Sequence, residues 1–398
     1  MAEAAQRGFH YGHPDWSNLG QGAPEVGPLP GAPDRIEQMA LPTESYEYAP
    51  VGGLMELRAA VAQLYNDRYR RGMRSQYTAE NVAISSGGRA GLTRVAASLG
   101  SVHLGHFLPD YTAYEELLET FRGFVPIPIL LDPKQGFTIE LSRLRDEIMG
   151  AGLAALLLSN PCNPTGHLVQ GDELARWVDT CRELSCCLIV DEFYAHFLYG
   201  GESAPSSVSA SAYVEDVDKD PVVLVDGLTK NWRYPGFRLS WTLGPRSIIE
   251  RVTSAGSFLD GGPPHPLQKA VLPLIAGDVA DREARAIQDH FGNKRKLVLD
   301  RVRSMGMKLA ADPSGGFYAF AALDALPPAL RDGMDFFRAA LDRNVIVVPG
   351  EFFDVNPGQR RGHIPSRLKG YVRISYGPDM GSLVSGLDRL EELVRSAA

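Results

Sequence analysis

The sequence predicts an α/β protein with a mostly parallel central sheet, covered by helices on both faces, and a smaller C-terminal α/β domain. Short apolar runs alternate with longer stretches of helical period, which is typical of a parallel sheet built from strand–helix–strand units. This alternation changes after about residue 277, where a long polar helical stretch begins. The length of 398 residues allows one large domain or two unequal ones.

The elements of the large domain follow from the period of their apolar residues. Short apolar runs predict buried strands at residues 82–85, 105–108, 125–130, 153–159, 188–191, 222–226 and 239–243. Apolar residues that recur with helical spacing predict helices at residues 54–71, 90–99, 114–121, 172–184 and 246–257. We therefore expect the large domain at residues 46–280.

The two ends of the chain are expected to differ from this central part. Residues 1–45 are rich in Gly and Pro and are expected to form an extended arm and part of the small domain. A polar helix at about 281–304 begins the C-terminal part, which we expect to form the small domain at residues 281–398. Short strands alternate with helices there, and we expect strands at residues 317–321, 345–348 and 372–375.

Composition excludes several classes of partner. The net charge is −8, from 40 basic and 48 acidic residues without a basic block, which argues against nucleic acid as the main partner. No apolar run reaches the length of a membrane span, and the N-terminus lacks the apolar core of a signal peptide. The four cysteines form no Cys-x-x-Cys pair and no disulfide framework, so we expect a reducing, cytoplasmic setting.

Polar residues gather at the ends of several predicted strands, where ligands bind in sheets of this kind. The run Ser-Gly-Gly-Arg at 86–89 follows the first strand and opens a helix, so its backbone N–H groups would favour a phosphate. The run Asn-Pro-Cys-Asn-Pro-Thr-Gly at 160–166 follows the strand 153–159, and its Asn-Pro steps impose a fixed path. Its amide side chains suit the orientation of a polar ring. Either run is also compatible with a purely structural turn.

Two charged residues end further strands. Asp191 directly follows a buried apolar run, and a buried carboxylate needs a cationic partner, either a protonated ligand nitrogen or a salt bridge. Lys230 lies just past the strand 222–226, where desolvation lowers the pKa of an amine and favours imine chemistry, although most lysines are simply solvated. Together the strand ends supply the four groups that pyridoxal 5'-phosphate (PLP) needs. These are a phosphate cradle, an anion at the ring nitrogen, a donor to the ring oxygen and a lysine.

At these residues the chain resembles the class I/II aminotransferases, which are PLP-dependent enzymes of fold type I. The resemblance covers nearly the whole chain and rests first on the Asn-Pro-x-Asn-Pro-Thr-Gly run and on Arg238, eight residues after Lys230. Matching segments also lie at residues 18–24, 48–58, 86–89, 109–114 and 372–375. The resemblance implies a large domain of the PLP-dependent transferase fold, type I, in a homodimer.

The resemblance also implies roles for single residues. Lys230 would hold PLP as a Schiff base and move the α-proton, Asp191 would pair with the pyridinium nitrogen, and Tyr194 would bond the ring oxygen. The other cofactor contacts would come from Gly87, Gly88, Arg89, Thr229 and Arg238 at the phosphate, from Tyr111 stacked on the ring, and from Asn163 at the ring oxygen. Tyr48 would reach the phosphate bound in the neighbouring subunit. The substrate would be held by Arg373 at its α-carboxylate, with Asn163 and Gly22. No metal is expected.

Three features stay open at this level. Gly227 stands where the family often has a hydroxyl residue that contacts the phosphate, so phosphate binding would depend more on Arg238 and the turn at Gly87. His265 either lines the pocket or lies in a solvated turn. No second arginine is recognisable for the side chain of a dicarboxylic substrate, and the amino donor is not identified.

The function that follows is transfer of an amino group between an amino acid and a 2-oxo acid. The same cofactor residues would also serve a PLP-dependent elimination or cyclisation in specialised amino-acid metabolism. Arg373 and Arg238 favour transamination. A PLP-binding regulator would need a DNA-binding module, and the chain has no additional basic segment of ~60 residues.

Overall fold

The computed structural model describes residues 1–120, 123–201 and 205–397. Its largest sheet has seven strands in the order β2-β8-β7-β6-β5-β3-β4. Their bounds are β2 (Val82–Ser85), β3 (His103–Leu108), β4 (Val125–Leu130), β5 (Ala155–Ser159), β6 (Cys187–Asp191), β7 (Val222–Gly227) and β8 (Ser240–Leu243). Strand β8 runs in the opposite direction to the other six strands, which are parallel to one another, so the prediction of a mostly parallel central sheet is confirmed.

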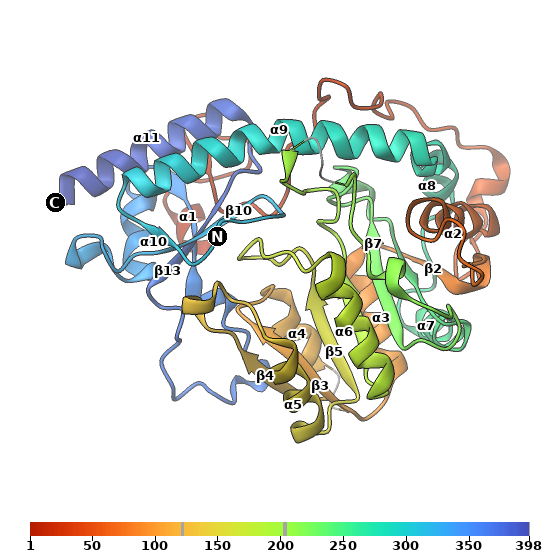
Figure 1. Ribbon diagram of the computed structural model, residues 1–398. Helices are drawn as coiled ribbons and strands as arrows, with labels where there is room; N and C mark the ends of the chain where they lie inside the picture. The colour runs from red at the N-terminus through yellow and green to blue at the C-terminus, as the bar shows by residue number, and fades with distance from the viewer. Residues whose placement is uncertain (121–122, 202–204, 398) are drawn as a thin grey trace.

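Helices cover both faces of this sheet (Figure 1). One apolar core lies under α2 (Met55–Tyr69), α5 (Leu141–Ala151) and α6 (Gly171–Glu183), and a second lies under α3 (Gly88–Leu99), α4 (Ala113–Thr120) and α7 (Arg246–Leu259). The central strands contribute to both cores, because alternate side chains of a strand point to opposite faces. In β5, Leu156 and Leu158 enter the first core, whereas Ala155 and Leu157 enter the second. Burial on both sides explains why these strands are continuous apolar runs.

Helix α5 was not predicted from the sequence. Its buried stripe consists of only two residues, Leu144 and Ile148, so its helical period is weak. The predicted helix 114–121 corresponds to α4, although its last predicted residue lies outside the described residues. No helix in the described part of the chain is apolar over a length that would cross a membrane.

The C-terminal part begins with the long helix α9 (Gly277–Ser304), which starts beside α8 (His265–Ala270) and runs across the molecule to α11 (Met380–Ala397) (Figure 1). An antiparallel sheet of order β12-β13-β10-β9 follows, formed by β9 (Lys308–Leu309), β10 (Tyr318–Ala322), β12 (Val348–Pro349) and β13 (Tyr371–Ser375). Helix α10 (Gly333–Leu341) packs on β11, β12, β13 and α11.

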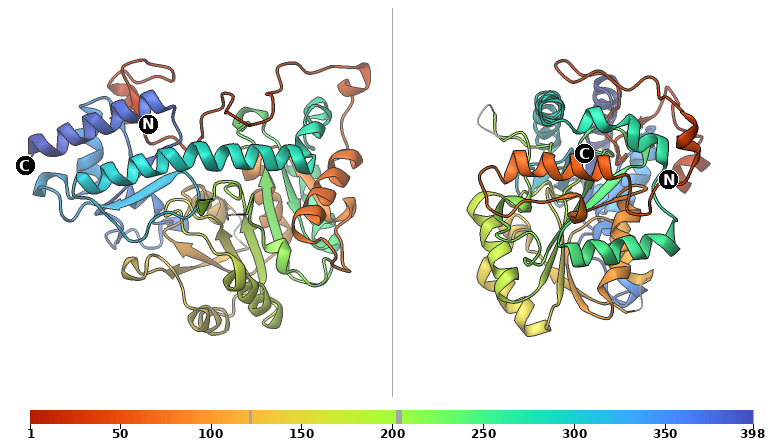
Figure 2. Two further views of the ribbon diagram at one scale, coloured as in Figure 1. Left: turned by 45° about the horizontal axis from the view of Figure 1, so that its top comes forward. Right: turned by 90° about the vertical axis from the view of Figure 1, so that its right-hand side faces the viewer.

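The predicted strand 345–348 is divided between two sheets. Its first half is β11 (Val345–Ile346), which pairs in parallel with β1 (Ser17–Asn18) of the N-terminal arm, and its second half is β12. The arm starts with the short helix α1 (Ala2–Gln6) and, after β1, crosses the top of the molecule to α2 (Figure 2). The arm therefore contacts both parts of the chain. The boundaries at residues 46 and 281 stay a prediction.

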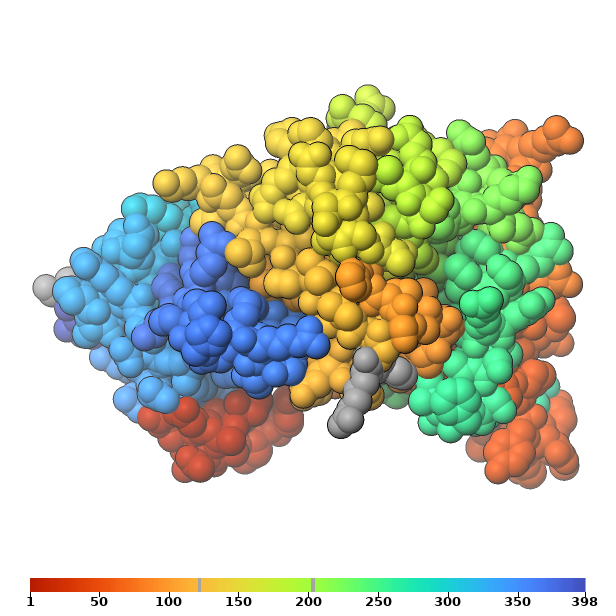
Figure 3. Space-filling view, turned by 90° about the horizontal axis from the view of Figure 1, so that it is seen from below, coloured from red at the N-terminus to blue at the C-terminus, as the bar shows by residue number. Residues whose placement is uncertain are grey.

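The two parts also meet on the opposite side of the molecule. In the view of Figure 3, the segment around residue 355 lies against the segment that contains α4. Glu115 of α4 accepts hydrogen bonds from the backbone N–H of Asn356 and from the side chain of Gln359, at 2.8 Å each. The backbone N–H of Asp110 donates to the carbonyl of Phe353 at 3.1 Å. The arm and this contact bring β13 to the carboxyl ends of the large sheet.

Candidate active site

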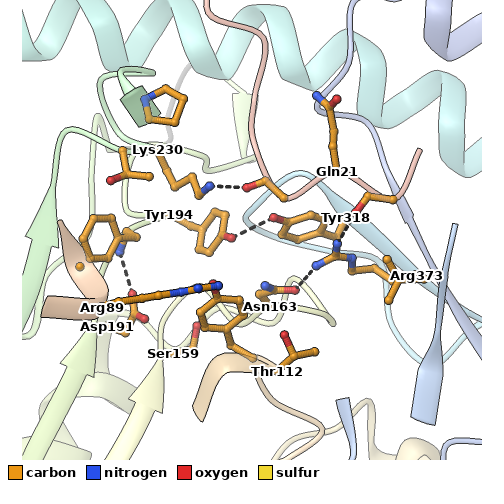
Figure 4. Close-up of a pocket in the computed structure, with 18 of the residues that line it drawn as sticks. Gln21, Arg89, Thr112, Ser159, Asn163, Asp191, Tyr194, Lys230, Tyr318 and Arg373 are labelled. Atoms are coloured by element: carbon orange, nitrogen blue, oxygen red, sulfur yellow. Dashed lines mark hydrogen bonds between the residues drawn. The ribbon is translucent and has the colours of Figure 1, made fainter. Parts of the chain in front are cut away.

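A cavity of about 720 Å³ lies where the carboxyl ends of β5, β6 and β7 meet β10, β13 and the arm (Figure 4). Eleven of the residues proposed from the sequence line it: Gly22, Gly88, Arg89, Tyr111, Asn163, Asp191, Tyr194, Thr229, Lys230, Arg238 and Arg373. Gly87 lies directly behind its wall, whereas Tyr48 and His265 do not line it. The structure therefore brings together residues from strand ends that are far apart in the sequence.

One end of the cavity is built to receive an anion. Helix α3 begins at Gly88, and its N-terminus has no side-chain cap because the preceding residue, Gly87, has no side chain. Gly87 has a φ of 93°, which favours glycine. The guanidinium of Arg238 lies over Gly87, in the space that a Cβ atom there would occupy. The hydroxyl of Thr229 is buried and has no hydrogen-bond partner among the described residues. Free helix N–H groups, a cation and an unpaired hydroxyl together fit a phosphate.

Gly227 cannot be replaced by a hydroxyl residue in this backbone. A Cβ atom at this position would lie 2.5 Å from the Cα of Ser240 and 2.6 Å from the carbonyl oxygen of Leu239. The close approach of β7 and β8 therefore requires glycine. Thr229, two residues later, instead supplies a buried hydroxyl to the cavity.

Asp191 ends β6 at the floor of the cavity and is only 6% exposed. Its Oδ2 accepts a hydrogen bond from the hydroxyl of Tyr114 at 2.7 Å, and its Oδ1 accepts one from the backbone N–H of Phe193 at 3.3 Å. Burial raises the pKa of Asp191, and the bond from Tyr114 opposes this shift. Among the described residues, no arginine, lysine or histidine forms an ion pair with it. This buried carboxylate therefore lacks a cationic partner within the described part of the chain.

Arg373 faces the cavity from the centre of the antiparallel sheet (Figure 4). It is 5% exposed, and its guanidinium donates to the Oδ1 of Asn163 at 2.8 Å and to the carbonyl of Gly20 at 2.9 Å. The ring centroids of Tyr318 and Phe353 lie 4.1 and 5.0 Å from its guanidinium carbon. No carboxylate within the described ranges pairs with it, and its Nε has no partner there. This buried cation is positioned to bind an anionic ligand group.

Tyr318 was missed by sequence reasoning because it belongs to a strand of the other part of the chain. Its hydroxyl lies 2.9 Å from that of Tyr194, and either group can be the donor. Burial raises the pKa of Tyr318 to about 12. Tyr194 is thereby oriented toward the cavity next to Asn163, as Figure 4 shows. The side chains of Tyr194 and Asn163 thus both line the cavity and can form hydrogen bonds there.

Lys230 follows β7 and is half-buried, with its Nζ donating to the carbonyl of Gly22. Burial, together with the charges of Arg373 and Arg238, lowers the pKa of its amine to about 8. The next residue, Asn231, fixes the loop, because its Nδ2 donates to the carboxylate of Asp226 at 2.7 Å and to the carbonyl of Glu192 at 2.9 Å. A neutral amine near physiological pH is what attack on a carbonyl requires.

This lowered pKa predicts the reactivity of Lys230 in the cofactor-free protein. Its amine should react with acetic anhydride with a midpoint near pH 8. Lys219 is a matched internal control, because it is exposed and Asp216 raises its pKa, so it should react only at much higher pH. Peptide mass spectrometry across a pH series measures both residues in one sample. Equal midpoints for the two lysines would contradict the assignment.

Arg89 is a third guanidinium in the cavity, beside those of Arg238 and Arg373, and the sequence assigned it only to the phosphate turn. It lies in the first turn of α3, is exposed, and donates from Nη2 to the hydroxyl of Tyr111 at 3.2 Å. In the described part of the chain it has no carboxylate within ion-pair distance. No second arginine was recognisable in the sequence, and the structure places the guanidinium of Arg89 in the same cavity as that of Arg373. The sequence contained a signal for this position. Arg89 lies two residues after Gly87, close to the carboxyl end of β2, where ligands bind in sheets of this kind.

The two remaining predicted residues lie elsewhere. His265 begins α8, and its Nδ1 lies 3.1 Å from the carbonyl oxygen of Glu47, so it lies at a helix start and not in the cavity wall. Tyr48 is 96% exposed and does not reach the cavity of its own chain.

Three comparisons relate the chain to known proteins. A family model described as aminotransferase class I and II matches residues 14–390. An aspartate aminotransferase from Streptomyces avermitilis is 26% identical over 384 residues, which cover 92% of this chain and 86% of that protein. An aspartate/prephenate aminotransferase from Thermus thermophilus is 26% identical over 375 residues, covering 92% and 88%. The crystal structure of an aminotransferase from Mycobacterium tuberculosis has a TM-score of 0.80 at 24% identity, covering 99% of this chain and 95% of that one.

Proposed function

The chain belongs to the class I and II aminotransferase family, and we propose that it uses PLP bound at Lys230 to transfer an amino group from an acidic amino acid to a 2-oxo acid. Members of this family depend on PLP. When bound, PLP supplies an electron sink for the bonds at the substrate's α-carbon. Everything else in the reaction falls to side chains of the cavity.

The donor set of the cavity fits this cofactor. The uncapped start of α3, the orphaned hydroxyl of Thr229 and the cation of Arg238 would hold the phosphate. Asp191 would keep the proton on the ring nitrogen. Asn163 and Tyr194 would bond the ring oxygen, with Tyr111 against the ring. Lys230 would attach the cofactor and then carry the proton to and from the α-carbon, for which an amine with a pKa of about 8 is suited.

The preference for an acidic substrate rests on one observation: three guanidinium groups of the cavity, those of Arg89, Arg238 and Arg373, lack a carboxylate partner among the described residues. Arg238 would be used by the phosphate, which leaves Arg89 and Arg373 for the substrate. Arg373 would bind the α-carboxylate. Arg89 would then bind a second acidic group, together with the hydroxyl of Tyr111. The curated relatives named above include an aspartate aminotransferase, which supports this reading.

The test is a panel of amino acids added to the purified, PLP-loaded protein. Conversion of the cofactor spectrum to that of its amine form, with a 2-oxo acid of matching mass, is expected for aspartate or glutamate. Release of ammonia without the amine form would instead indicate elimination, the alternative chemistry on this fold. Conversion by neutral amino acids alone would contradict the acidic substrate.

Arg89→Met should separate acidic from neutral donors. The kcat/KM for the preferred acidic amino acid should fall by about 10- to 100-fold, because one partner of a charge pair is lost, while that for alanine should stay unchanged. Arg361→Met is the control, because Arg361 lines the neighbouring cavity but already pairs with Asp354 at 2.7 Å. An equal loss for acidic and neutral substrates would sink the role of Arg89.

We further propose a homodimer, in which the exposed Tyr48 reaches the cavity of the partner subunit, and a cytoplasmic location. The four cysteines are free thiols, and three of them are buried, which supports a reducing compartment.

A further inference from the structure

The arm contributes backbone carbonyls, and not only side chains, to the wall of the cavity. The carbonyl of Gly20 accepts from Arg373, and the carbonyl of Gly22 accepts from Lys230. Residues 19–42, all of which the structure describes, form neither helix nor strand. A backbone without regular structure holds its position only through tertiary contacts.

The first contact comes from Arg233, three residues after Lys230. Its side chain is fully buried, and its Nη1 donates to the arm carbonyls of Gly27 at 2.6 Å and Glu25 at 3.2 Å. Its Nε donates to Glu283 of α9 at 2.8 Å. The loop that carries the lysine thus holds the backbone of the arm.

The second contact runs in the opposite direction. Arg35 of the arm donates from Nη1 to the carbonyl of Trp232 at 3.0 Å and from Nη2 to the carbonyl of Arg233 at 2.7 Å. Its guanidinium carbon lies 3.5 Å from the ring centroid of Tyr234, and its Nη1 lies 3.6 Å from the Oε1 of Glu283. The arm therefore holds the backbone of the lysine loop.

We propose that Arg35, Arg233 and Glu283 form a reciprocal clamp that positions the arm as a wall of the substrate pocket. Each arginine donates hydrogen bonds to backbone carbonyls of the segment that carries the other arginine. Both guanidinium groups also pair with the carboxylate of Glu283, which is 2% exposed. The three are positioning residues, since none of them lines the cavity. They act through the backbone of Gly20 and Gly22, which lines the cavity, and through Arg373, which donates to the carbonyl of Gly20.

The clamp differs from a buried arginine that only stabilises the fold. Arg70 provides the comparison within this chain. It is fully buried and donates to the carbonyls of Ser75, Ser211 and Val214. Neither Arg70 nor any of these three residues lines the cavity. Loss of Arg70 should lower stability and leave the pocket unchanged. Loss of the clamp should change the pocket.

The test compares Arg35→Met with Arg70→Met in the PLP-loaded protein. In Arg35→Met, hydrogen–deuterium exchange of peptides covering residues 20–37 should accelerate at least about tenfold. The backbone N–H groups of Glu25 and Ile36 donate to the carbonyl of Gly377 and the hydroxyl of Tyr234, and these bonds should open more often when the arm is held less firmly. The KM for the amino-acid donor should rise about tenfold, with kcat within about threefold. Arg70→Met should lower Tm and change neither the exchange of these peptides nor KM.

Arg35→Lys is a second variant that is less disruptive to folding, because it keeps the positive charge. It loses the paired Nη1 and Nη2 donors, so we expect changes in exchange and KM that are smaller than those of Arg35→Met. Unchanged exchange of the arm in both Arg35 variants would overturn the clamp. Faster exchange with an unchanged KM would overturn its role in the substrate pocket. The KM readout rests on the proposed function, whereas exchange needs no turnover. A failure of the proposed substrate is thus distinguishable from a failure of the clamp.

Discussion

Lys230→Ala is expected to lower kcat for amino-group transfer by about four to six orders of magnitude. Among the described residues that line the cavity, Lys230 is the only lysine and there is no histidine. The carboxylate of Asp191 is held at the floor of the cavity by hydrogen bonds from the hydroxyl of Tyr114 and the backbone N–H of Phe193. The described lining of the cavity therefore offers no second amine and no imidazole that could carry a proton at the α-carbon. Single-turnover kinetics with the preferred donor measure the loss.

The attachment of the cofactor is checked in the wild-type protein. Borohydride reduction followed by peptide mapping should place the pyridoxyl group on Lys230, and a label on another lysine would contradict the assignment. Lys219→Ala, which changes an exposed lysine, should retain full activity. Mixing Lys230→Ala with Tyr48→Phe subunits should recover activity above either parent, because one site of a hybrid dimer collects both substitutions. No recovery in confirmed hybrids would argue against shared sites.

The large sheet was predictable because its strands are buried on both faces. Asn163, Asp191 and Lys230 follow apolar runs whose carboxyl ends must meet at one edge of a parallel sheet, so their clustering follows from topology. The requirement for glycine at position 227 was not predictable. It depends on the approach of Ser240 from a neighbouring antiparallel strand.

The other wall of the cavity required the structure. Tyr318 and Phe353 surround Arg373 only because the antiparallel sheet lies against the large one. Arg35 and Arg233 are about 200 residues apart in the sequence, and no local pattern relates them. The spacing of apolar residues along the sequence indicates which face of a helix or strand is buried. It does not report which side chain of a distant element fills the same space.

Asp191→Ala is expected to slow removal of the α-proton by at least about a thousandfold, which corresponds to about 4 kcal/mol. Without this carboxylate, nothing holds a proton on the ring nitrogen, so electrons leaving the α-carbon are stabilised less. Burial raises the pKa of Asp191, and the 2.7 Å bond from Tyr114 works against that shift. Tyr114→Phe should therefore have the same direction of effect but a smaller size, on the order of tenfold.

Single-turnover reactions with α-deuterated and normal substrate isolate the proton-transfer step in these variants. Asp110→Asn is the matched control, because Asp110 is also a buried carboxyl group of the same region, 1% exposed, yet it does not line the cavity. Its amide replacement should leave the rate within about tenfold of wild type. If Asp191→Ala kept a rate close to that of Asp110→Asn, the proposed partner of the ring nitrogen would be wrong. The buried charge at the end of β6 would then serve only to fix Tyr114 and α4 against the sheet.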